Sequence, residues 1–316
     1  MLTLVIPVYR NEGSLPDLLV AVSKLNEQLD GKMETVFVVD GSPDRCYEIL
    51  RTELPLCEFA SQLLLLTRNF GSFAAIRAGL AVGKGDRFAV MAADLQEPPE
   101  MVLEMNRVLM SEEVDVVVGV REVRHDPLLT RLPAQLFWSL YRRYVVHDIP
   151  PGGVDVFGCN RLFKDTLLKL EENHSSLIAQ IFWLGFRRKC ITYVRQRRVH
   201  GTSAWTLRKK VTYLMDSVFA FTDLPIRLLI RVGAIGVTLA LMLGVFVVLA
   251  RVFGAISVPG YTMTLIVMIF FGALNLLSLG LVGSYAWRAY ENTKHRPLSI
   301  TLRVDVFNTH LPKSAL

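Results

Sequence analysis

Acidic, amide and basic residues follow five short apolar runs in the first 121 residues of the chain. These polar segments span 7–12, 40–44, 68–71, 94–99 and 119–121. Residues of these types could bind a polar, charged ligand. Two common nucleotide sites are excluded, because there is no GxGxxG after the first run and no GxxxxGK[ST] in the chain. The six His and four Cys residues lack metal-ligand spacing, which argues against a zinc site.

The apolar runs alternate with stretches of helical spacing, which predicts a doubly wound α/β domain. Strands are predicted over 2–8, 35–39, 62–67, 88–93 and 114–120, and helices over 15–29, 44–53, 73–82 and 98–110. The strand runs are continuously apolar, as is typical of strands buried on both faces of a mostly parallel sheet. Ligands bind outside the carboxyl ends of the strands in such a sheet, so we expect the polar segments to meet at one edge.

The high hydropathy of the chain is concentrated near its C-terminal end. Hydrophobic residues make up 52% of the sequence, and the mean hydropathy is +0.37. Residues 232–250 and 252–287 contain no charged side chain. About 20 helical residues cross a bilayer core of about 30 Å, and Pro259-Gly260 interrupt the longer run. We therefore expect two transmembrane helices, at about 230–251 and 261–284, within a hairpin at 228–287.

A basic block precedes this apolar region. Residues 173–215 contain nine Lys or Arg and no Asp or Glu, whereas the net charge of the whole chain is +6. A helix predicted over about 205–222 is amphipathic and favours the membrane surface. The positive-inside rule predicts that both termini are cytoplasmic. The position of the block beside the membrane favours anionic lipid, and not nucleic acid, as its partner.

The polar segments, in their order along the chain, resemble the family-2 glycosyltransferases, and most closely the polyprenyl-phosphate glycosyltransferases. The resemblance is carried by IPVYRNE at 6–12, VDGSPD at 39–44, RNFG at 68–71, ADLQEPP at 93–99 and RVHGTS at 198–203, followed by the hairpin. It implies a cytoplasmic GT-A domain at 1–202, an amphipathic juxtamembrane helix at 203–223 and a cytoplasmic C-terminal tail at 288–316. It also implies a homo-oligomer, with a tetramer as the suggested form.

The resemblance implies a set of residues that contact the nucleotide sugar. These are Pro7, Tyr9, Asn11, Glu12, Asp40, Arg68, Asn69, Gly71, Asp94, Arg198 and Ser203. For Asp40 the contact would be with the base or ribose, and the alternative is an Asx-type turn in a strand–helix loop. For Asp94 the alternative is a cap on the following helix.

The resemblance further implies residues for the metal, the acceptor and the reacting centre. Asp94 and Gln96 would hold Mg²⁺ or Mn²⁺, which stabilises charge on the departing diphosphate. Ala92 stands where many relatives carry an additional Asp. Arg121, Arg131 and Ser139 would face the acceptor phosphate. Asp155 would act beside Asp94 at the reacting centre, as base or orienting group, with a structural role as the alternative.

The function that the resemblance implies is inverting hexose transfer from a nucleotide sugar to polyprenyl (undecaprenyl) phosphate at the cytoplasmic membrane face. We favour glucose from UDP-glucose, with GDP-mannose and a UDP-aminoarabinose as alternative donors. A processive family-2 enzyme is disfavoured, because no Gln-x-x-Arg-Trp segment is present. A different kind of alternative is a catalytically inactive membrane scaffold, which Ala92 favours.

Overall fold

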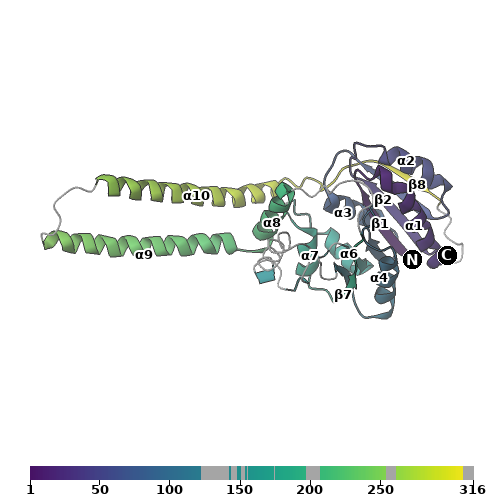
Figure 1. Cartoon of the computed structure of the whole chain (residues 1–316), viewed down its shortest axis with the longest axis horizontal. Helices are drawn as coiled ribbons and strands as arrows, with labels where there is room; N and C mark the ends of the chain where they lie inside the picture. Colours follow the sequence, from purple (N-terminus) through teal and green to yellow (C-terminus); the bar gives the residue numbers. More distant parts are fainter. Residues whose placement is uncertain are drawn as a thin grey trace.

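The protein consists of a sheet domain from which two long helices extend (Figure 1). The computed structural model describes residues 1–121, 142–143, 148–150, 154, 156–173, 175–196, 207–253 and 261–308. The statements below concern these residues.

Eight strands of the described part form one mixed sheet in the order β7-β5-β6-β4-β1-β2-β3-β8. They are β1 (Leu2–Val8), β2 (Met33–Val39), β3 (Ala60–Leu66), β4 (Arg87–Val90), β5 (Val116–Arg121), β6 (Phe157–Asn160), β7 (Arg188–Tyr193) and β8 (Thr301–Phe307). β1 pairs in parallel with β2 and β4, β2 with β3, and β5 with β7. β6 and β8 run antiparallel to their neighbours. The predicted α/β fold with a mostly parallel sheet is therefore confirmed.

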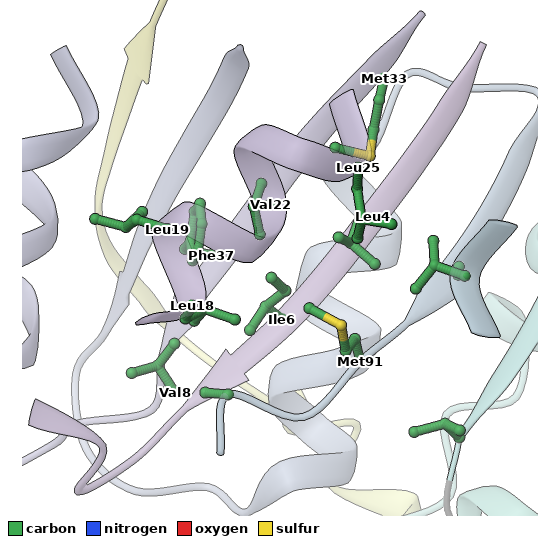
Figure 2. Packing of buried hydrophobic residues seen from close by; sticks show 14 of the residues in the cluster. Leu4, Ile6, Val8, Leu18, Leu19, Val22, Leu25, Met33, Phe37 and Met91 are labelled. Atoms are coloured by element: carbon green, nitrogen blue, oxygen red, sulfur yellow. The ribbon is translucent and has the colours of Figure 1, made fainter. Parts of the chain in front are cut away.

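Helices cover both faces of the sheet. They are α1 (Leu15–Gln28), α2 (Cys46–Glu53), α3 (Ser72–Val82), α4 (Glu100–Ser111), α6 (Arg161–Leu168) and α7 (Leu177–Trp183). One core cluster joins Leu4 and Ile6 of β1 to Leu18 and Val22 of α1 (Figure 2). Val5 belongs to a second cluster, which also contains residues of α3, α6 and α7. Successive strand side chains point to opposite faces, so the continuously apolar β1 supplies both cores.

The C-terminal tail expected over 288–316 contains a strand of the sheet. β8 adds to the edge of β3, with Leu63 opposite Asp305. The Tyr47 hydroxyl donates to Asp305 Oδ2 at 2.6 Å, and Asn308 Nδ2 donates to the Leu54 and Cys57 carbonyls at 3.0 and 2.6 Å. The chain thus returns from the long helices to the sheet domain.

Three described helices follow β7 in the chain: α8 (Leu207–Phe221), α9 (Leu224–Val252) and α10 (Tyr261–Thr293). α9 and α10 contain most of the apolar region. α9 and α10 contact each other and extend together from the sheet domain (Figure 1). In the described part, one helical segment, Phe270–Thr293, is long and apolar enough to cross a membrane, with a mean hydropathy of 1.3. This segment overlaps the span expected at about 261–284, and the other span of the expected hairpin, at about 230–251, remains a prediction.

α8 connects α10 to the sheet domain. Its Tyr213 ring lies 6.1 Å from the ring of Phe73 on α3, and Ser176 Oγ donates to the Tyr213 hydroxyl at 3.0 Å. Asp216, also of α8, pairs with Arg288 of α10 at 2.8 Å. Part of the helix expected at the membrane surface therefore packs on protein, and its contact with lipid remains a prediction.

Candidate active site

The loops that follow β1, β2, β3 and β4 meet at one edge of the sheet. β1 lies between β2 and β4, so the strand order reverses there. In open α/β sheets this reversal marks the crevice in which ligands bind. The sequence predicted that the polar segments meet, and their hydrogen bonds bear this out.

The loops after β1 and β2 are tied by side chains that accept backbone N–H groups. The Arg10 amide donates to Ser42 Oγ at 2.8 Å, and the Glu12 amide donates to Asp44 Oδ2 at 3.2 Å. Burial raises the pKa of Asp44, but hydrogen bonds from Ser42 and from backbone amides outweigh it and leave the pKa below its ordinary value. An ionised Asp44 therefore holds the two loops together. The Asn11 side chain accepts the Tyr9 amide at 3.1 Å.

Glu12 forms an ion pair with Arg45 at 2.7 Å. Hydrogen bonds from Arg45 lower the pKa of Glu12, so this carboxylate stays ionised. Glu12 is expected to contact the nucleotide sugar, and it would have to do so while it is paired with Arg45. Cys46 contributes no nucleophile, because burial raises the pKa of its thiol to about 12.

Asp40 joins the end of β2 to the loop after β3. Its carboxylate is almost fully buried, at 2% exposure, and accepts the amides of Phe70 at 2.7 Å and Gly71 at 2.8 Å. Asn69 Nδ2 donates to the Asp40 carbonyl at 3.3 Å, and the Arg68 guanidinium lies 4.3 Å from the Phe70 ring. The observed bonds bridge two loops about 30 residues apart, which differs from the local Asx turn considered as an alternative. The expected nucleotide contact remains a prediction.

Replacing Asp40 with asparagine is expected to destabilise this loop junction. Both carboxylate oxygens of Asp40 accept a backbone N–H, whereas asparagine has one oxygen and one NH2 group, so one N–H would face another donor. Charge-assisted hydrogen bonds of the kind that is lost contribute about 1.5–3 kcal/mol. We expect a lower thermal unfolding midpoint and weaker nucleotide binding. Asp17→Asn, on the exposed side of α1, is the control. An unchanged midpoint in Asp40→Asn would show that the junction does not depend on this carboxylate.

The loop after β4 carries the expected metal ligands. The Gln96 amide donates to Asp94 Oδ1 at 3.3 Å, and Ser14 Oγ donates to the Ala93 carbonyl at 2.9 Å. Leu95, between the two expected ligands, has a φ of +53°, so the loop turns sharply there. These contacts hold the Asp94 loop against the start of α1.

The side chain of Gln96 is engaged by a residue that the sequence analysis did not select. Arg195, just after β7, donates through Nη2 to Gln96 Oε1. The Gln196 amide donates to the Gln96 carbonyl at 2.9 Å, and Gln96 Nε2 donates to the Gln196 carbonyl at 3.4 Å. The oxygen expected to ligate a metal thus faces a cation. About 100 residues separate the partners, and no local pattern pairs them.

The described residues fit a divalent ion only if a bound phosphate-containing ligand and water supply most of the ion's coordination. No group of three or more His, Cys, Asp or Glu in the described part could hold a metal. Mg²⁺ commonly takes one or two carboxylates, with phosphate oxygens and waters completing its shell. Asp94 suits that arrangement.

Five of the expected site residues lie outside the described part of the chain: Arg131, Ser139, Asp155, Arg198 and Ser203. Arg121 is described, and it ends β5 opposite Tyr193 of β7. β5 runs parallel to β4, because the intervening β6 is antiparallel to both. Arg121 therefore lies at the same edge of the sheet as Asp94.

A mixed sheet whose polar loops meet at the strand-order reversal is consistent with a GT-A nucleotide-sugar domain. Residues 3–170 match the family model described as "Glycosyl transferase family 2". The chain belongs to this family and is a glycosyltransferase.

Similar curated proteins align over nearly the whole chain. The undecaprenyl-phosphate 4-deoxy-4-formamido-L-arabinose transferase of Pseudomonas paraeruginosa is 32% identical, over 96% of this chain and 90% of its own. The prophage bactoprenol glucosyl transferase homolog of Escherichia coli is 27% identical, over 96% and 99%. The uncharacterized glycosyltransferase YkcC of Bacillus subtilis is 30% identical, over 94% and 92%.

Proposed function

We propose that this glycosyltransferase moves a hexose from a nucleotide sugar to polyprenyl phosphate. The observation that carries the proposal is the joining of the four polar loops at one sheet edge, in a chain that continues into a long apolar helix. An acceptor with its phosphate at the membrane surface and its tail in the bilayer suits this arrangement. The names of the relatives from Pseudomonas and Escherichia, one an undecaprenyl-phosphate transferase and one a bactoprenol glucosyl transferase homolog, support the acceptor class.

In the proposed reaction an acceptor phosphate oxygen bonds to the anomeric carbon while the bond to the nucleoside diphosphate breaks. Attack from the opposite side inverts the anomeric configuration. A phosphate monoester is largely dianionic at pH 7, since its second pKa is about 6. The acceptor therefore needs less help from a base than a sugar hydroxyl, and Asp155 is proposed as an orienting group or base.

The proposed roles of the other residues follow from charge. Asp94 would hold Mg²⁺ or Mn²⁺, which would stabilise the departing diphosphate. Arg121, Arg131 and Ser139 are proposed to hold the acceptor phosphate, since guanidinium groups bind phosphate in a planar fork. The residues proposed to bind the nucleotide sugar are Pro7, Tyr9, Asn11, Glu12, Asp40, Arg68, Asn69, Gly71, Asp94, Arg198 and Ser203.

We also propose that α9 and α10 both cross the membrane, with the sheet domain and both termini on the cytoplasmic face. The return of the chain into β8 supports this topology, because it brings the trailing end of α10 back to the sheet domain. The domain limits of 1–202, 203–223, 228–287 and 288–316, and assembly as a homo-oligomer, are part of the same proposal.

A donor panel tests the proposed function. Purified protein is incubated with Mg²⁺, undecaprenyl phosphate and radiolabelled UDP-glucose, GDP-mannose or UDP-4-deoxy-4-formamido-L-arabinose. We expect a labelled glycolipid, formed fastest from UDP-glucose. Faster transfer from another donor would correct the sugar and keep the reaction class. If no donor yields glycolipid, the inactive scaffold that Ala92 favours becomes the better explanation.

A further inference from the structure

Arg195 lies at the loop expected to hold the metal, although it follows β7, an edge strand that two other strands separate from β4. Its neighbour Gln196 exchanges hydrogen bonds with Gln96 through backbone and side chain. These bonds fix the segment after β7 against the Asp94 loop. The Arg195 guanidinium then reaches Gln96 Oε1.

Much of the binding capacity of Arg195 is unused. A guanidinium has five N–H donors and a permanent positive charge. Within the described part, Arg195 Nε is buried and donates to no acceptor, and no carboxylate pairs with the guanidinium. A cation that has no carboxylate partner among the described residues suits an anion that enters the site. Asp94, two residues from Gln96, is the nearby group that could hold a divalent ion beside the same anion.

We propose that Arg195 binds the diphosphate of the donor and that Gln96 aims its guanidinium, in place of acting as a metal ligand. This inference rests on the proposed function, because it assumes a nucleoside diphosphate at this edge. Gln96 would then be a positioning residue. Its carbonyl can accept one N–H of the guanidinium and leave the remaining fork for phosphate oxygens.

If Arg195 binds the diphosphate, part of the UDP affinity should be independent of metal and should persist in EDTA. The affinity for UDP is measured by titration calorimetry in EDTA and in Mg²⁺. We expect Arg195→Ala to weaken binding about tenfold or more in EDTA, where no metal contributes, since charge-assisted bonds to phosphate are strong. We expect Gln96→Ala to weaken the same binding, and the double variant to be no weaker than Arg195→Ala, because the two residues act as one unit.

Two further variants sharpen the result. Asp94→Asn is expected to keep the affinity in EDTA and to lose only the increase that Mg²⁺ produces. Arg195→Lys is expected to recover part of the affinity, since it keeps the charge without the fork. Arg161→Ala, beside Asp86 and away from this edge, is the control. If Arg195→Ala fails to fold, Arg195→Gln carries the test, with the same loss expected.

Three outcomes are distinguishable. Wild-type affinity of folded Arg195→Ala in EDTA would overturn the role of Arg195. Loss of only the Mg²⁺ increment in Gln96→Ala would assign Gln96 to the metal and overturn the pairing. If the wild-type chain binds neither UDP nor GDP in either condition, the proposed function itself fails.

Discussion

Asp94→Asn is expected to lower glycosyl transfer by about 10²- to 10³-fold, the usual loss when a group that stabilises transition-state charge is removed. Asparagine can still accept the Gln96 amide through its side-chain oxygen, so the loop keeps the bond that Asp94 Oδ1 makes at 3.3 Å. What is lost is the negative charge, and with it the proposed hold on Mg²⁺ or Mn²⁺. Activity is measured as labelled glycolipid across a Mg²⁺ titration.

The dependence on Mg²⁺ distinguishes a metal ligand from a structural residue. If Asp94 holds the metal, half-maximal activity of Asp94→Asn should need a higher Mg²⁺ concentration, while the thermal midpoint stays close to that of the wild type. Asp86→Asn is the matched control, because Asp86 is exposed and pairs with the N-terminal amine at 3.1 Å. Full activity of Asp94→Asn would remove Asp94 from the site.

Gly41→Ala is expected to cost about 2–5 kcal/mol of stability and to abolish nucleotide binding, because strain and overpacking add at this position. Gly41 has a φ of +56°, in the left-handed region that favours glycine. A Cβ there would lie 2.3 Å from the carbonyl carbon of Arg68 and 2.5 Å from the Asn69 nitrogen. These are backbone atoms, so relief requires the 68–71 loop to move away from Asp40.

A second glycine separates the two causes. Gly31 has a φ of +69° but nothing within 4 Å of its would-be Cβ. Gly31→Ala should therefore incur only the conformational cost, about 1–2 kcal/mol. The difference between the two thermal midpoints, measured in the same detergent, reports the steric contact with the 68–71 loop. Equal midpoints would mean that this loop yields without cost, and UDP affinity should then survive in Gly41→Ala.

The sequence alone was sufficient to predict the sheet domain and the edge at which its site lies. Continuous apolar runs such as 2–8 identify strands buried on both faces, because each face of β1 needs its own apolar side chains. The carboxyl ends of parallel strands share an edge, so the sequence predicts that the segments containing Asp40 and Asp94 lie at the same edge of the sheet. Both inferences depend on local periodicity and on a general rule of topology.

The tertiary structure decided which groups the site residues contact. Asp40 accepts amides from Phe70 and Gly71, Gln96 meets Arg195, and β8 completes the edge of β3. These partners lie about 30, 100 and 240 residues apart in the chain. Periodicity reports which face of an element is buried, but it carries no information about which distant backbone or guanidinium will satisfy a given oxygen. Those pairings arise only when the sheet order places the loops side by side.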